Sequence, residues 1–173
     1  MQLNKIENTT LVLTGVFLLF SYYRLGSTTK NVNELWGSID GSFRTLYIVS
    51  MFICALGFLA LFIYLNTINK LGPLNKHCLY ISLMGIVLFS VFWMPLSIYY
   101  LMKKKSKEDG LCFVKVLVLF TLFLVALSAF FVVYELQKVQ DKSMLYKLSY
   151  YGMCYFFFHV FVLDFTTWSY HFF

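Results

Sequence analysis

Charge is scarce in this sequence. Only 13% of its 173 residues are Asp, Glu, Lys or Arg, about half the share found in soluble domains. Hydrophobic residues make up 60% of the chain and aromatic residues 21%. A soluble chain of this length could not bury so much apolar surface in one core. The composition therefore excludes a soluble monomer, a nucleic-acid-binding module and a disordered chain, and it indicates an integral membrane protein.

Cysteine is also sparse and widely spaced. The four cysteines form neither a CxxC motif nor an adjacent pair: Cys54, Cys78, Cys112 and Cys154. This spacing excludes a disulfide-stapled secreted domain and supports neither a redox motif nor a zinc site. We expect the thiols to pack as small hydrophobic side chains.

Catalytic signatures are missing as well. The chain contains no HExxH, no GxSxG, no phosphate-binding or dinucleotide-binding glycine motif and no paired carboxylates. These absences favour a protein that is not an enzyme. No metal or cofactor is predicted, and a bound lipid is left open. No segment of the chain identifies a family.

Long charge-free stretches predict where the chain crosses the membrane, because a bilayer core needs about 20 apolar residues in a helix. Lys115 and Glu135 enclose one such stretch, and we expect both side chains to reach the membrane boundary. The first stretch is not followed by a cleavage site and is predicted to be retained. The predicted fold is all-α, a polytopic transmembrane bundle in one domain, 1–173, with helices near 8–25, 45–65, 78–102, 113–135 and 148–170.

The longest connection between predicted helices runs from Arg24 to Arg44. Its apolar residues are spaced roughly for one helical face, which predicts an interfacial amphipathic segment with Trp36 at the level of the headgroups. Because Gly37 and Gly41 interrupt it, an irregular loop is an equal alternative.

The positive charges favour one orientation. With five helices, six Lys side chains fall at the N-terminal face and eight Lys or Arg at the other. The positive-inside rule then predicts the N-terminus outside and the C-terminus inside, with Lys103–Lys107 in the cytosol. Which membrane holds the chain is left open.

Asp164 is the one carboxylate that the span boundaries do not explain. It lies inside the last predicted helix, where a charge costs several kcal/mol unless it is paired, protonated or hydrated. α-Helical spacing places Trp168 and His171 on its face and turns His159, five residues earlier, about 140° away. An Asp–His pair within this helix is therefore not expected. A structural alternative is that a Ser or Thr of a neighbouring helix holds Asp164.

Two further features are candidates for a polar site inside the membrane. His159 lies near the middle of the last helix, where a hydrogen bond to a neighbouring helix is the simpler alternative to a ligand role. The third helix carries Ser82, Ser90 and Ser97 on one face, with Pro95 as a kink. Such a stripe suits a cavity, and it equally suits helix packing.

Two functions follow from these patterns. The first is a non-catalytic accessory or structural subunit packed among membrane-protein partners, or with copies of itself, in a larger assembly. The alternative is a small transporter, channel or lipophilic-ligand-binding bundle that uses the candidate polar residues Asp164, His159, His171, Ser82, Ser90, Ser97 and Pro95. A lipid-modifying enzyme is disfavoured because Asp164 lacks an evident second catalytic group.

Overall fold

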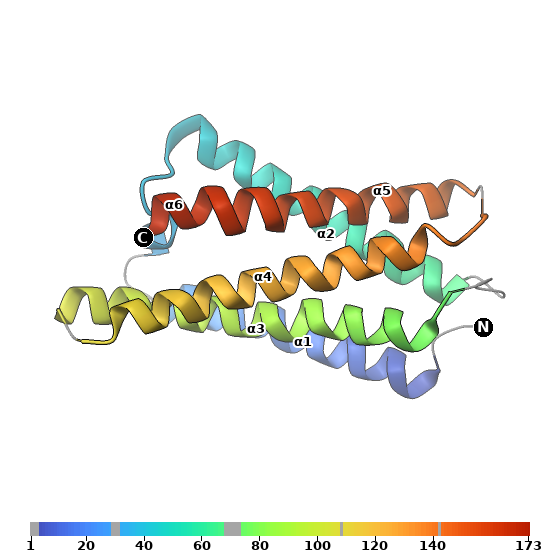
Figure 1. Cartoon of the computed structure of the whole chain (residues 1–173), viewed down its shortest axis with the longest axis horizontal. Coiled ribbons are helices and arrows are strands. Elements are labelled where there is room, and N and C mark those ends of the chain that lie inside the picture. The colour runs from blue at the N-terminus through green and yellow to red at the C-terminus, as the bar shows by residue number, and fades with distance from the viewer. Residues whose placement is uncertain (1–3, 29–31, 68–73, 108, 142) are drawn as a thin grey trace.

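The chain folds as a bundle of long helices (Figure 1). The computed structural model describes residues 4–28, 32–67, 74–107, 109–141 and 143–173. Within these ranges, five helical segments are long and apolar enough to cross a membrane. They are α1 (Lys5–Thr28), α2 (Gly41–Thr67), α3 (Lys76–Ser106), α4 (Leu111–Leu136) and a last segment made of α5 (Met144–Phe158), η2 (His159–Trp168) and α6 (Ser169–Phe172). The predicted all-α membrane fold is confirmed.

The helices are longer than the charge-free stretches predicted. α3 continues through Lys103, Lys104 and Lys105 before a left-handed residue, Lys107, ends it. Lysines suit this end because the last turn of a helix carries partial negative charge. At the other end of α3, the Asn75 side chain accepts a hydrogen bond from the Cys78 N–H at 3.1 Å and caps the first turn.

Packing orders the helices as α1, α3, α4, α5 and α2 (Figure 1). α3 packs along α4, α2 packs along α5, and the contact between α4 and α5 joins the two pairs. α1 packs on α3 at the edge of the bundle, and only 6% of its most apolar stretch is buried. The two chain ends lie at opposite ends of the bundle.

Small residues bring the helices of each pair together. A Cβ added to Gly57 of α2 would lie 2.7 Å from the Cα of Gly152 in α5, which is closer than side chains pack. In α4, Ala126 and Ala129 are fully covered. Close approach along small residues is the usual pattern of membrane helix packing.

The segment before α2 is packed against the end of the bundle. It forms a short 3₁₀ turn, η1 (Val32–Trp36). Leu35 and Ile39 are buried, and the Trp168 indole donates a hydrogen bond to the Leu35 carbonyl at 2.8 Å. The structure lies between the two predicted alternatives, because a single helical turn is followed by irregular backbone at Gly37 (φ +57°).

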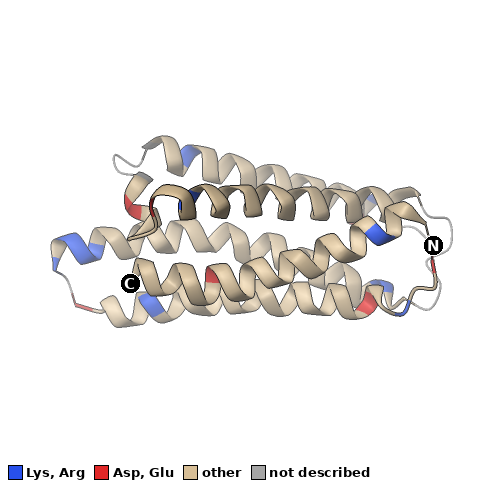
Figure 2. Cartoon of the chain, turned by 90° about the horizontal axis from the view of Figure 1, so that it is seen from above, with Lys and Arg blue, Asp and Glu red and all other residues tan. Residues whose placement is uncertain are grey.

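Charged residues gather at the two ends of the bundle (Figure 2). Lys115 lies near one end, with its ammonium 4.8 Å from the Phe173 ring centroid. Glu135 lies in the last turn of α4, where its side chain is only 3% exposed because neighbouring parts of the chain cover it. It is held by Lys138 Nζ at 2.6 Å and by the Asn75 N–H at 2.9 Å.

The orientation stays a prediction. Of the side chains on which it depends, Lys30, Lys70 and Lys142 lie outside the described residues.

Candidate functional site

The last membrane segment changes its helical geometry around Asp164. From His159 to Trp168 the backbone is a π-helix, in which hydrogen bonds join residues five apart. The Ser169 N–H donates to the Asp164 carbonyl, and the Ser169 hydroxyl contacts the same oxygen at 3.1 Å. The Thr167 hydroxyl reaches five residues back in the same way, to the Val162 carbonyl at 3.0 Å. These hydroxyls come from the helix itself and donate to carbonyl oxygens in its wider turns.

The π-helix brings Asp164 and His159 onto one face. Their closest atoms, Asp164 Oδ1 and His159 Nε2, are 3.6 Å apart. The prediction that these residues point away from each other is wrong because it assumed α-helical spacing. The wider turn of a π-helix rotates each residue less than an α-helix does, so a separation of five residues turns the two side chains much less than the α-helical 140° and brings them together.

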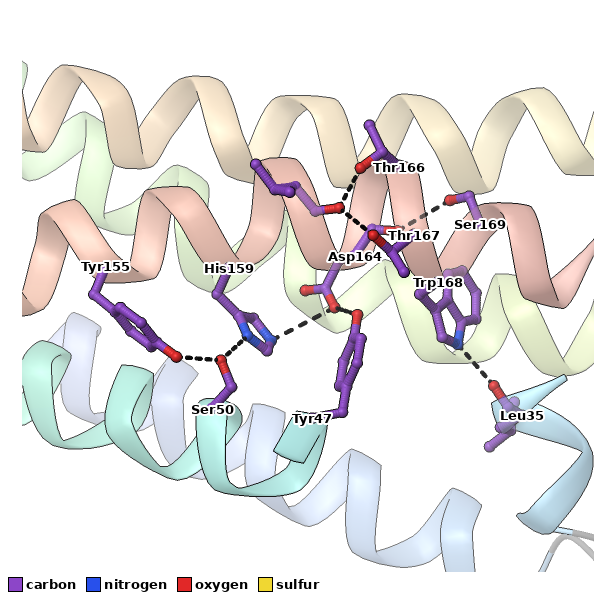
Figure 3. A network of polar contacts seen from close by, with 11 residues as sticks. Leu35, Tyr47, Ser50, Tyr155, His159, Asp164, Thr166, Thr167, Trp168 and Ser169 are labelled. Atoms are coloured by element: carbon purple, nitrogen blue, oxygen red, sulfur yellow. Dashed lines mark hydrogen bonds and ion pairs between the residues drawn. The ribbon is translucent and has the colours of Figure 1, made fainter. Parts of the chain in front are cut away.

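Side chains of α2 complete a polar network around this pair (Figure 3). The Tyr47 hydroxyl donates to Asp164 Oδ1. Ser50 Oγ lies 2.7 Å from His159 Nδ1 and 2.7 Å from the Tyr155 hydroxyl. The network therefore runs from Tyr47 through Asp164, His159 and Ser50 to Tyr155, and it joins α2 to the last membrane segment.

One assignment of protons satisfies the whole network with a neutral imidazole. The Tyr155 hydroxyl donates to Ser50, and Ser50 donates to His159 Nδ1. The other imidazole nitrogen then carries its proton toward Asp164, which also accepts from Tyr47. In this assignment each hydrogen bond of the network donates toward the Asp164 carboxylate, which is the only group of the network that carries no proton.

Most of the network is buried inside the bundle. His159 and Tyr47 are buried at 4% and 3% exposure, whereas the Asp164 side chain keeps 20%. Asp164 also lies eight residues before the end of the last candidate span. Its partners are a phenol and an imidazole, and not the Ser or Thr hydroxyl of the structural alternative.

The other predicted site residues lie elsewhere. His171 Nδ1 is 2.6 Å from Ser38 Oγ, so His171 fastens the segment before α2 and is not bonded to Asp164. Among the described residues, no hydrogen bond or ion pair links the serines of α3 to the network. Ser97 donates to the Trp93 carbonyl at 2.9 Å, and Ser82 is buried in the packing.

The part of α3 near Pro95 approaches the site through aromatic rings. The Tyr22 hydroxyl donates to the Ser90 carbonyl at 2.7 Å, five residues before Pro95. Tyr22 also packs on Trp93, and the Trp93 ring centroid is 5.2 Å from that of Trp168. Pro95 itself is exposed. The predicted polar stripe is therefore divided between helix packing and an aromatic contact.

Sequence reasoning missed three members of the network. Tyr47, Ser50 and Tyr155 were not among the residues predicted to form a polar site. Tyr47, Ser50 and Cys54 are spaced for one face of α2, which is the signal that could have grouped them. The objection to an enzyme, that Asp164 lacks a second ionisable group, also fails because His159 lies beside it.

Metal chemistry has no visible basis in the described part of the chain. It contains no group of three His, Cys, Asp or Glu side chains placed to hold an ion. The four cysteines are free thiols, of which Cys54 is buried and Cys112 is exposed.

The comparisons with known proteins identify no relative. No protein-family model, curated protein or solved structure matches this chain. The chain is therefore described by its own architecture, as a helical bundle with five candidate membrane spans.

Proposed function

We propose that this chain is a small multi-pass transport protein in which Asp164 and His159 bind and pass on a proton inside the membrane. The observation that carries the proposal is the 3.6 Å approach of a carboxylate and an imidazole within one span. Ionisable residues inside a membrane are costly, and chains of Asp, Glu and His are the usual parts of proton relays. Long stretches of π-helix are rare, and π-turns are frequent at functional sites.

The network supplies a path for the proton on one side of the pair. Asp164 can accept a proton from His159 Nε2, His159 Nδ1 takes one from Ser50, and Ser50 takes one from Tyr155. Tyr155, which is half-buried, takes up a replacement proton from outside the network. The 2.7 Å separations are those of good hydrogen bonds, so only the 3.6 Å step needs a small closing movement. Because 20% of the Asp164 side chain is exposed, the carboxylate is the end at which a proton enters or leaves.

The same contacts would also serve as a static link between α2 and the last segment. Conservative substitutions separate the two roles. Replacing Asp164 by Asn keeps an acceptor for Tyr47 and removes the carboxylate that takes up and releases the proton. A static link tolerates this change, whereas a relay does not.

The experiment measures proton flux into vesicles that contain the purified protein and a trapped pH-sensitive dye, driven by a potassium diffusion potential. We expect flux with the wild-type chain and its loss in Asp164→Asn and His159→Gln. Asp109→Asn is the matched control, because it removes an exposed carboxylate from the connection between α3 and α4. Flux that is equal in Asp164→Asn and the control would refute the proposal.

A second candidate is the accessory subunit predicted from the sequence, and α1 is the observation that favours it. This helix packs mainly on α3, and its apolar residues Leu13 and Val16 are 64% and 59% exposed. A partner helix in the same membrane would cover them.

Bulky substitutions test this second candidate. Leu13→Trp should break a complex seen on native gels in mild detergent, while Leu59→Trp on the exposed face of α2 (52% exposed) should not. Lipid accommodates either tryptophan, whereas a packed partner does not. A complex that survives both substitutions, or a protein that is a monomer when extracted from native membranes, excludes α1 as the contact.

A further inference from the structure

A pocket of about 330 Å³ lies where α4 ends and α5 begins, at the end of the bundle away from the C-terminus. It lies between two candidate spans, Leu111–Leu136 and Met144–Phe172, and so at a membrane boundary. Six residues line it: Gln137, Asp141, Tyr146, Lys147, Tyr150 and Tyr151. None of them belongs to the Asp164 network.

Three tyrosine rings form the walls of this pocket. Tyr146 and Tyr150 are stacked, with ring centroids 6.0 Å apart and planes inclined by 17°. Tyr150 and Tyr151 meet edge to face at 5.3 Å and 67°. The rings therefore lie in two orientations along the wall of the pocket. The negative face of a tyrosine ring attracts a quaternary ammonium group without any hydrogen bond.

Hydrogen bonds hold two of the rings in place. The Tyr146 hydroxyl donates to the Leu136 carbonyl at 2.9 Å, and Gln137 Nε2 donates to the Tyr150 hydroxyl at 3.2 Å. Both partners belong to the end of α4, so the walls are fixed by the helix connection. Fixed walls lower the cost of ordering the site when a ligand binds.

The pocket carries one charge of each sign. Asp141 is positioned by Ser143, whose N–H and hydroxyl donate to its two carboxylate oxygens at 2.8 and 2.9 Å. Lys147, one turn into α5, supplies the positive charge. A zwitterionic ligand, which carries both a cation and an anion, matches this pair.

We propose that the pocket binds a phosphocholine group, the headgroup of a choline phospholipid. The trimethylammonium group lies against the tyrosine rings and near Asp141, and the phosphate lies near Lys147. A primary ammonium headgroup fits less well, because it is more strongly hydrated and loses more of that hydration against the rings, although Asp141 offers it an acceptor. The pocket lies at the depth at which phospholipid headgroups are found. This proposal is independent of the proton relay.

Competition between lipids tests the proposal. The protein, purified in a maltoside detergent, is offered equal amounts of dioleoyl phosphatidylcholine and dioleoyl phosphatidylethanolamine, and bound lipid is counted by native mass spectrometry. We expect the choline lipid to be retained in excess. Tyr151→Leu should weaken that retention about two- to fivefold, the range for one cation–π contact, while Tyr151→Phe should preserve it.

A matched control and a soluble ligand complete the test. Tyr23→Leu removes a tyrosine of α1 that is 72% exposed, against 66% for Tyr151, and should change nothing. Displacement of the lipid by free phosphocholine supports recognition of the headgroup alone, whereas a Tyr151-dependent lipid that phosphocholine does not displace supports recognition of the intact lipid. Equal retention of the two lipids, or equal loss in both Leu variants, overturns the proposal.

Discussion

The contact between Gly57 and Gly152 allows a quantitative prediction. In Gly57→Ala the new Cβ would lie 2.7, 2.8 and 2.9 Å from Cα, C and O of Gly152. Carbon atoms pack at about 3.5–4.0 Å. The obstacle is backbone on a facing helix and not a flexible side chain. α2 and α5 must therefore separate by about 1 Å.

The cost follows from that separation. Overpacking of a tight interface typically costs about 1–3 kcal/mol, and alanine gains back about 0.5–1 kcal/mol over glycine inside a helix. Gly15→Ala is the matched control, because a Cβ there meets no atom within 4 Å. The difference between the two variants removes the helix-propensity gain that both share. We expect Gly57→Ala to be less stable than Gly15→Ala by about 1–3 kcal/mol.

Unfolding in mixed detergent and dodecyl sulfate micelles, followed by circular dichroism, measures this difference. A second readout is the polar network, since the same helix pair carries the 2.7 Å contact between Ser50 and His159. Separation of the helices should weaken that contact and shift the imidazole nitrogen resonances of His159. Equal stability of Gly57→Ala and Gly15→Ala would refute the close approach on which the reasoning depends.

Two predictions concern the ends of the bundle. The hydrogen bond to Glu135 raises the pKa of Lys138, so the pair stabilises the fold at neutral pH and this stabilisation is lost as pH rises through the raised pKa. Glu135→Gln should therefore lower the thermal stability at pH 7 and match wild type in strong alkali. A difference in thermal stability that persists in strong alkali would contradict this. In a Cys78→Ser background, a membrane-impermeant maleimide should label exposed Cys112 only after cells are permeabilised; labelling of intact cells would reverse the predicted orientation.

The positions of the spans were predictable because the membrane imposes them on the composition. A charge inside the bilayer is so costly that charged residues mark the ends of helices. The predicted ranges stop short at Lys103–Lys105, where α3 runs on for another turn. Charge marks the boundary of the bilayer and not the ends of the helix. The ends of α3 are set by the cap that Asn75 forms and by the left-handed turn at Lys107.

The contacts of Glu135 could not be predicted in the same way. Its place at the end of α4 follows from the sequence, but the backbone N–H of Asn75 that holds it comes from a different part of the chain. A single helix read in isolation contains no sign of that donor.

By itself, the sequence determined that the chain is a membrane-spanning helical bundle and that Asp164 is its exceptional charge, since both follow from where charge is absent. Only the tertiary structure decided what Asp164 contacts. The π-helix from His159 to Trp168 rotates the two ionisable side chains onto one face, and the close packing of α2 brings Tyr47 and Ser50 to them. The spacing of apolar residues does not reveal a change from backbone hydrogen bonds between residues four apart to bonds between residues five apart. That change depends on a few side-chain hydroxyls and on the facing helix.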